Sequence, residues 1–223
     1  MKDQLFPRKG QYHQVVILSD FDGVISRENV LEALYSEFSP ADWQHYVNLW
    51  QMGELSAAEE IPLCLGGVNT PRDELERFVT SLEIDQSFKD LHRFCNAGGY
   101  FLAITSDGLR WYIKLLLNKI NVEEVPIFSN EIHFKEEGLT FSFPWYDPST
   151  PLNGTSKATI VKKFQNLGYT VLYIGDGLSD LEAARAAEIV FAKNYLLDQM
   201  NREGKKVEQF EDFHQIINVL SSD

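Results

Sequence analysis

The stretch VVILSDFDGVIS, from Val15 to Ser26, carries the strongest fold signal in the chain. It begins with a run of β-branched and apolar residues, as expected for a parallel strand that is covered on both faces. It ends in two aspartates, Asp20 and Asp22, with one residue between them and Gly23 after them. Residues two apart on an extended chain point to the same side, so both carboxylates should face one space. Two carboxylates are unfavourable inside a buried strand, so this pair indicates a polar site at the strand end.

The composition limits what that site can be. The 223 residues, 44% of them hydrophobic, can bury a sizeable core in one domain or in a core domain with a smaller insert. The formal net charge of −13 repels nucleic acid and anionic lipid, so a ligand that carries phosphate needs a local cation or metal. The cysteines Cys64 and Cys95 are too far apart in sequence to indicate a disulfide framework or a zinc site. Because the N-terminus is polar and the next apolar run is short, we expect a cytoplasmic protein with no nucleic-acid or membrane partner.

The rest of the chain alternates between strand-like and helical segments. Apolar runs at residues 100–104, 171–174 and 189–192 repeat the strand pattern. Helical segments precede two of them, with Gly98 and Gly168 predicted as C-terminal caps. This alternation predicts an α/β fold with a Rossmann-like, three-layer core and a mostly parallel sheet.

Two segments interrupt the alternation. Residues 27–82 contain no strand-like run but several helix starts, among them a capping box at Ser56 and a Ser/Thr-Pro pair at Ser39 and at Thr70. They predict a helical-bundle cap domain, inserted into a core made of residues 1–26 and 83–223. Two alternating runs joined by a glycine-bearing turn predict a β-hairpin between residues 127 and 143.

Further polar residues fall where the predicted strands end. Ser106 and Asp107 follow the second strand, Asp176 and Asp180 follow a later one, and Lys157 stands at a helix start. In a doubly wound sheet, ligands bind beyond the carboxyl ends of the strands, so these groups should gather around Asp20 and Asp22.

The gathered groups suit phosphoryl transfer. A carboxylate that attacks phosphorus approaches a dianion, and a divalent cation with an ammonium group offsets the repulsion. The carboxylates of Asp20 and Asp176, with a backbone carbonyl near Asp22, offer the oxygen ligands that Mg²⁺ prefers. Lys157 supplies the ammonium and Ser106 a hydroxyl donor. The Asp22 carboxyl is then free to protonate the leaving alkoxide and to activate the water that follows.

Four motifs together resemble those of the haloacid dehalogenase superfamily, in the same order: DFDGV at 20–24, ITS at 104–106, Lys157, and GDGLSD at 175–180. The helical insert after the first motif and the hairpin before the lysine are similar to the phosphoserine-phosphatase branch. Within that branch, SDG after the second strand and FAKNYLLDQMNREG after the last are most similar to the methionine-salvage phosphatases, which act on a methylthiopentenyl phosphate.

The resemblance implies a role for each motif residue. It implies that Asp20 is the nucleophile and Asp22 the acid and base, and that Asp180 orients a metal-bound water. The implied phosphate ligands are Ser106, Asp107 and Lys157, and the implied Mg²⁺ ligands are Asp20, Asp22 and Asp176. The candidates for substrate selection in the insert are Glu28, Asn29, Trp43, Tyr46 and Trp50, although aromatic residues at helical spacing are more often bundle core.

The expected function is that of a Mg²⁺-dependent phosphomonoesterase that hydrolyses a small phosphorylated metabolite. Alternatives are a phosphatase for phosphoserine, another amino-acid phosphate or pyridoxal phosphate, a catalytically inactive binding protein with this fold, and a carbon–halogen hydrolase. The segment 53–67 contains no basic residue, so we expect L-phosphoserine to be a poor substrate. The oligomeric state is left open.

Overall fold

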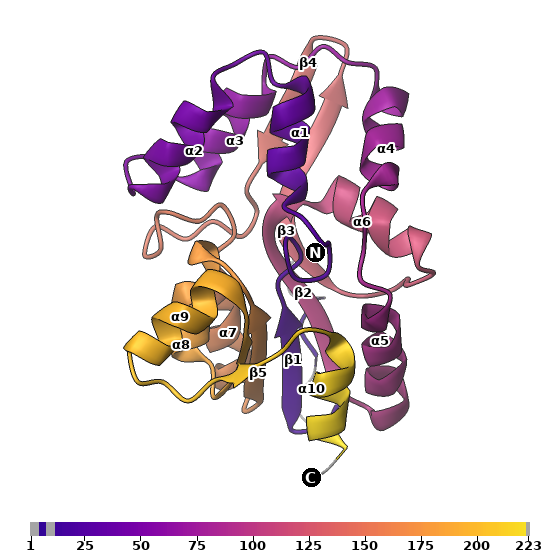
Figure 1. Cartoon of the computed structure of the whole chain (residues 1–223), viewed down its shortest axis with the longest axis vertical. Helices are drawn as coiled ribbons and strands as arrows, with labels where there is room; N and C mark the ends of the chain where they lie inside the picture. Colours follow the sequence, from indigo (N-terminus) through magenta and orange to yellow (C-terminus); the bar gives the residue numbers. More distant parts are fainter. Residues whose placement is uncertain (1–4, 8–11, 222–223) are drawn as a thin grey trace.

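The computed structural model describes residues 5–7 and 12–221 (Figure 1). Most of the polar N-terminal segment, residues 1–4 and 8–11, lies outside the described residues. No helix within the described part of the chain has the length and apolar character that crossing a membrane requires.

A seven-stranded sheet in the order β4-β3-β2-β1-β5-β6-β7 forms the centre of the fold. Every pair is parallel except β3 with β4, so the predicted α/β fold with a mostly parallel sheet is confirmed. The strands are β1 (Val15–Ser19), β2 (Phe101–Leu109), β3 (Ile127–Lys135), β4 (Gly138–Ser142), β5 (Thr170–Gly175), β6 (Ile189–Ala192) and β7 (Glu208–Gln209). The predicted hairpin is confirmed as β3 and β4.

Helices cover both faces of the sheet (Figure 1). The helices of the core are α5 (Ser87–Gly98), α6 (Arg110–Lys119), α7 (Lys157–Asn166), α8 (Leu181–Ala186), α9 (Asn194–Arg202) and α10 (Phe213–Leu220). Side chains alternate along β1, so Ile17 packs in one hydrophobic cluster with Phe88 of α5, while Val16 and Leu18 pack in a second cluster with Phe164 of α7. The result is the three-layer core that the sequence predicts.

Four further helices lie between β1 and β2 in the chain and occupy the upper part of Figure 1. They are α1 (Val30–Phe38), α2 (Trp43–Gln51), α3 (Ala57–Leu65) and α4 (Arg72–Ser81). The chain leaves and returns through two adjacent antiparallel segments, because the Asp85 N–H donates to the Ile25 carbonyl at 2.8 Å and the Arg27 N–H donates to the Glu83 carbonyl at 3.1 Å. We call α1–α4 the insert helices.

Some helix ends differ from the sequence prediction. Gly99, not Gly98, adopts the left-handed conformation that ends α5. Helix α2 begins after Asp42, whose side chain accepts from the His45 N–H at 3.4 Å, and Ser39 instead ends α1. The capping box at Ser56 is present, and Pro71 rather than Thr70 precedes the first residue of α4.

A loop of the core reaches the insert helices. The carbonyl of Leu152, in the segment between β4 and α7, accepts a hydrogen bond from the Trp50 indole at 3.2 Å and another from the Ala57 N–H at 2.9 Å. The same segment continues to Lys157, the first residue of α7. The insert helices are therefore joined to the core in two ways, by hydrogen bonds to this loop and by the two chain segments that link them covalently.

Candidate active site

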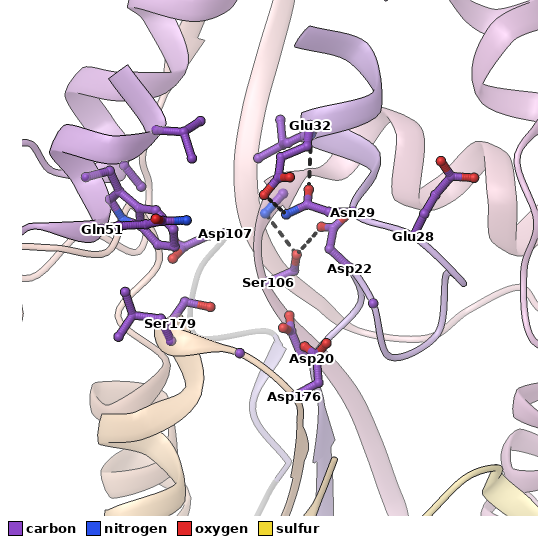
Figure 2. Close-up of a pocket in the computed structure, with 18 of the residues that line it drawn as sticks. Asp20, Asp22, Glu28, Asn29, Glu32, Gln51, Ser106, Asp107, Asp176 and Ser179 are labelled. Carbon is purple, nitrogen blue, oxygen red and sulfur yellow. Dashed lines mark hydrogen bonds between the residues drawn. The ribbon is translucent and has the colours of Figure 1, made fainter. Parts of the chain in front are cut away.

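A cavity of about 700 Å³ lies between the carboxyl ends of the parallel strands and the insert helices (Figure 2). Asp20 directly follows β1, and its N–H donates to the Ile174 carbonyl of β5 at 2.8 Å, which fixes it at the strand ends. The predicted core residues that line the cavity are Asp20, Asp22, Ser106, Asp107, Lys157 and Asp176. Asp180, which is 0% exposed, lies behind the lining residues.

Lys157 is the buried cation of the site, with 1% of its surface exposed. Its Nζ lies 2.9 Å from Asp20 Oδ1 and 2.7 Å from Asp180 Oδ1, and it donates to Ser179 Oγ at 3.0 Å. Burial alone would lower the pKa of Lys157, but the carboxylates of Asp180 and Asp20 raise it well above its ordinary value. Lys157 is therefore a permanent positive charge beside Asp20.

Asp180 has its hydrogen-bonding capacity filled by the protein. Oδ2 accepts from the N–H groups of Asp176 and Gly177 at 2.9 and 3.0 Å, and Oδ1 accepts from the Tyr173 hydroxyl at 2.6 Å as well as from Lys157. Burial alone would raise the pKa of Asp180, but Lys157 and these donors hold it below its ordinary value. Asp180 is thus an ionised anchor that fixes the loop carrying Asp176.

Three carboxylates are close enough to share a cation. One oxygen each from Asp20, Asp176 and Asp180 lies within 4.8 Å of the others, and Figure 2 shows Asp20 and Asp176 side by side. Burial and the neighbouring Asp180 carboxylate raise the pKa of Asp20 well above its ordinary value, and burial followed by the same carboxylate raises that of Asp176 to about 6. Crowded carboxylates with one ammonium group leave surplus negative charge, and their hard oxygens suit a divalent cation such as Mg²⁺.

The contacts of these carboxylates determine which of their oxygens remain open for a cation. Asp20 uses Oδ1 for Lys157 and for the Phe21 N–H at 2.7 Å, and Asp176 uses Oδ2 for Asn194 at 3.2 Å. Each therefore keeps one oxygen that these contacts leave open, whereas Asp180 does not. Gly23 permits the close approach of the two loops, because its φ is +73° and a Cβ there would lie 2.5 Å from Asp176 Oδ2.

The carboxyl of Asp22 is not one of these three carboxylates, and it is held from both sides. Oδ1 accepts from the Val30 N–H at the start of α1 at 2.9 Å, while Oδ2 accepts from the Tyr112 hydroxyl at 2.7 Å and from Ser106 Oγ at 3.3 Å. Burial raises the pKa of Asp22, although these donors oppose the shift. A carboxyl with a raised pKa keeps its proton to higher pH than an ordinary aspartate, which suits a group that gives a proton to a reacting atom.

Ser106 and Asp107 lie where the pairing of β2 with β3 becomes irregular, between Thr105 and Leu109. Such bulges redirect side chains at the edge of a site, and β2 continues through them rather than ending at Ile104 as the sequence pattern predicts. Asp107 Oδ1 accepts from the Thr155 N–H at 2.6 Å, but its buried Oδ2 has no hydrogen-bond partner among the described residues. Burial raises the pKa of Asp107 to about 6.

The structure brings some of the insert candidates to the cavity and not others. Glu28, Asn29 and Trp50 line it, whereas Trp43 and Tyr46 are not among the lining residues. Asn29 caps α1, since its Oδ1 accepts from the Glu32 N–H at 3.1 Å. Figure 2 shows the Glu28 side chain pointing away from Asp22 and Ser106. The Trp43 ring packs against that of Tyr35, 6.1 Å away.

Sequence reasoning missed three residues of this site. Tyr112 holds Asp22 from α6 and Tyr173 holds Asp180 from β5, and neither stands in a motif, so no sequence signal identifies them. Glu60 lines the cavity from α3 and accepts from the Tyr35 hydroxyl at 3.2 Å. A glutamate on the apolar face of a predicted helix is a signal that could have identified Glu60.

Comparison with solved structures assigns the fold. The chain superposes on a phosphoserine phosphatase from T. onnurineus with a TM-score of 0.69 at 12% identity, covering 96% of this chain and 98% of that one. It superposes on a phospho-aspartyl intermediate analogue of phosphoserine phosphatase with a TM-score of 0.65 at 15% identity, covering 92% and 97% of the two chains. The protein therefore has the HAD-like fold of the phosphoserine phosphatases, as the sequence predicts.

Comparison with curated protein sequences shows which phosphatases the chain is similar to. The chain is 26% identical to the 2-hydroxy-3-keto-5-methylthiopentenyl-1-phosphate phosphatase of Brevibacillus brevis, over 93% of this chain and 95% of the relative. It is 28% identical to the phosphatase of the same name from Exiguobacterium sibiricum, over 92% and 96% of the two chains. No family model matches the chain. The resemblance identified in the sequence is confirmed along nearly the whole length.

Proposed function

We propose that this protein is a Mg²⁺-dependent phosphomonoesterase that hydrolyses a small phosphorylated metabolite through an aspartyl-phosphate on Asp20. The observation that carries the proposal is the position of Asp20, which directly follows β1, lines the cavity and has the Lys157 ammonium 2.9 Å away. A buried lysine that is already paired with the attacking carboxylate offsets the charge of an arriving phosphate dianion.

In the proposed reaction, two half-reactions use the same pair of aspartates. A bond forms between an Asp20 carboxylate oxygen and phosphorus while the ester P–O bond breaks, and the departing alkoxide takes the Asp22 proton. Asp22 then takes a proton from water as the water oxygen bonds to phosphorus and the Asp20–phosphorus bond breaks, which releases inorganic phosphate. Ser106 donates its hydroxyl to a phosphoryl oxygen, and Asp107 orders the loop next to it through the Thr155 N–H.

Mg²⁺ fits the group of carboxylates described above. We propose that Asp20 and Asp176 hold the ion together with the main-chain carbonyl of Asp22, and that Asp180 keeps the Asp176 loop in place. When bound, the ion supplies positive charge that draws the phosphate toward Asp20 and offsets charge on the phosphoryl oxygens.

The insert helices are proposed to act as a cap domain, residues 27–82, over a core of residues 1–26 and 83–223. Supporting this division, the chain crosses between the two parts in adjacent segments at Ile25–Arg27 and Glu83–Asp85. Such paired linkers can bend together, and closure would exclude water from the reacting groups.

For the substrate, we propose 2-hydroxy-3-keto-5-methylthiopentenyl-1-phosphate, on which the relatives are named to act. L-Phosphoserine is the second candidate, because the solved neighbours are phosphoserine phosphatases. The described insert argues against it, since Arg72 and Arg77 pair with Glu76 and Asp73 and do not line the cavity. Arg27 lines the cavity, but it already pairs with Asp85 at 3.3 Å. A carboxylate buried without a partner is unfavourable by several kcal/mol.

The proposal is tested with p-nitrophenyl phosphate in the presence and absence of Mg²⁺. We expect turnover that requires the ion and that Asp20→Asn abolishes, with a phosphoryl group detected on Asp20 after acid quenching of the wild type. A wild type no more active than Asp20→Asn would support an inactive binding protein instead. Comparison of kcat/KM for the methylthiopentenyl phosphate, L-phosphoserine and pyridoxal phosphate then decides between the substrates.

A further inference from the structure

Glu60 is a buried acid in the cavity wall that the proposed chemistry does not use. It lies on α3, is 5% exposed and lines the cavity together with Ala57 and Ile61. The buried face of α3 repeats at helical spacing, and Glu60 occupies a position at which this pattern predicts an apolar residue. Burial of a carboxyl group is unfavourable unless hydrogen bonds satisfy it, so its partners decide what it can bind.

The partners of Glu60 leave part of its capacity open. Oε2 accepts from the Tyr35 hydroxyl at 3.2 Å and Oε1 accepts from the Cys64 thiol at 3.4 Å, and both donors are neutral. A carboxylate can accept about four hydrogen bonds, so two weak donors do not saturate it. Burial raises the pKa of Glu60 to about 7, as expected for a carboxyl without a paired cation. An additional donor can reach it from the cavity that it lines.

The charges around Glu60 select the kind of group that can approach it. The cationic residues among those described as lining the cavity are Lys157, which pairs with Asp20, and Arg27, which lies 3.3 Å from Asp85. Glu32 also lines the cavity, from α1 (Figure 2), and adds a second acidic group. A carboxylate on the substrate would therefore meet like charge, whereas a hydroxyl group would find an acceptor.

We propose that Glu60, held in place by Tyr35, is a specificity-determining residue that accepts a hydrogen bond from a hydroxyl group on the non-phosphorylated part of the substrate. It also disfavours esters that carry a carboxylate there. Val47 and Trp50 line the same cavity and give an uncharged carbon chain apolar surface to pack on. The substrate class is a phosphate ester of an uncharged, hydroxyl-bearing compound. This inference rests on the phosphatase function proposed above.

Two three-carbon esters test the proposal, because they differ at the end away from phosphate. Glycerol 3-phosphate ends in a hydroxymethyl group and 3-phosphoglycerate ends in a carboxylate. At a pH well above 7, where the Glu60 carboxyl is ionised, we expect kcat/KM of the wild type to favour glycerol 3-phosphate by about tenfold or more, the cost of leaving a buried polar group wrongly paired. In Glu60→Gln, whose amide can donate to a carboxylate, this ratio should fall about fivefold through a lower KM for 3-phosphoglycerate.

Controls separate selection from folding. Turnover of p-nitrophenyl phosphate, which has neither group, shows whether Glu60→Gln is folded and active. Glu37→Gln removes the same charge from an exposed position of α1 and should leave the ester ratio unchanged. An active Glu60→Gln enzyme with the wild-type ratio overturns the inference and leaves the proposed function intact. If Glu60→Gln does not fold, the wild type alone decides. A preference of the wild type for 3-phosphoglycerate overturns the inference, and a preference for glycerol 3-phosphate supports it. A wild type that hydrolyses no ester overturns both proposals.

Discussion

Replacing Asp22 with asparagine should separate the chemistry of this side chain from its role in the fold. The asparagine oxygen can keep the Val30 N–H bond of 2.9 Å, and the Tyr112 hydroxyl, now 2.7 Å from Oδ2, can turn to accept from the new amide. Burial raises the pKa of Asp22, so the fold does not depend on its negative charge. We therefore expect a change in unfolding free energy of about 1 kcal/mol or less.

The expected kinetic loss depends on the leaving group. For an alkyl phosphate, kcat/KM should fall by about 10²–10⁴, the usual contribution of a general acid. p-Nitrophenolate departs without a proton, so its kcat/KM should fall by much less. The comparison uses kcat/KM because this constant reports the steps up to the first irreversible one, here formation of the aspartyl-phosphate. The second half-reaction also loses its base, so p-nitrophenyl phosphate should release a burst of p-nitrophenolate before slow turnover.

Stopped-flow absorbance measures the burst, and a coupled phosphate assay measures the alkyl ester. Thermal unfolding and the Mg²⁺ requirement of the variant serve as controls and should match those of the wild type. Equal losses in kcat/KM for the two esters would refute Asp22 as the acid. A full rate of dephosphorylation in the variant would refute it as the base.

Three further outcomes are expected. Asp176→Ala should raise the Mg²⁺ concentration needed for half-maximal activity, and an unchanged requirement would exclude Asp176 as a ligand. Burial raises the pKa of Glu60 from 4.5 to about 7, so between these values the folded protein holds a proton that the unfolded chain has released. The contribution of this group to the free energy of unfolding should fall by roughly 3 kcal/mol as pH rises through that window. In Glu60→Gln, the free energy of unfolding, measured with denaturant, should therefore depend less on pH than in the wild type. An equal pH dependence in the two proteins would contradict this. Orthovanadate, as a phosphate mimic, should slow hydrogen exchange at the Ala57 amide, and unchanged exchange would argue against closure of the cap.

Local sequence patterns were sufficient for the sheet apart from the two-residue strand β7, and for the gathering of charged groups. The run before Asp20 has the continuous apolar character of a buried parallel strand, and the carboxyl ends of such strands meet at one edge. That rule places Asp20 and Asp176 together, and the structure has their oxygens within 4.8 Å. Helix ends were less predictable because tertiary contacts compete for capping residues. Ser39 looks like an N-cap, but its hydroxyl donates to the Cys64 carbonyl at 2.7 Å and so joins α1 to α3.

The supporting residues of the site could not be predicted for a related reason. Tyr112 reaches Asp22 across 90 positions of sequence, and only the packing of α6 against the strand ends brings the two together. Helical periodicity shows which face of the segment around Trp43 is buried, but not what it packs against. In the structure, the Trp43 ring packs against Tyr35, and Trp50 rather than Trp43 lines the cavity.

With the insert helices closing over the site as proposed, the Leu152 carbonyl offers a way to adjust product release by engineering, because the contact depends on donors that can be removed one at a time. Every residue type has a main-chain carbonyl, so substitution at position 152 cannot delete the acceptor. Trp50→Phe removes one bond, worth about 1 kcal/mol or a fivefold change in an opening equilibrium. Ala57 is the first residue of α3, a position that accepts proline, so Ala57→Pro removes the other bond with the helix start preserved. Dwell time of the product could thus be set in steps, without replacing any of the groups that perform the chemistry.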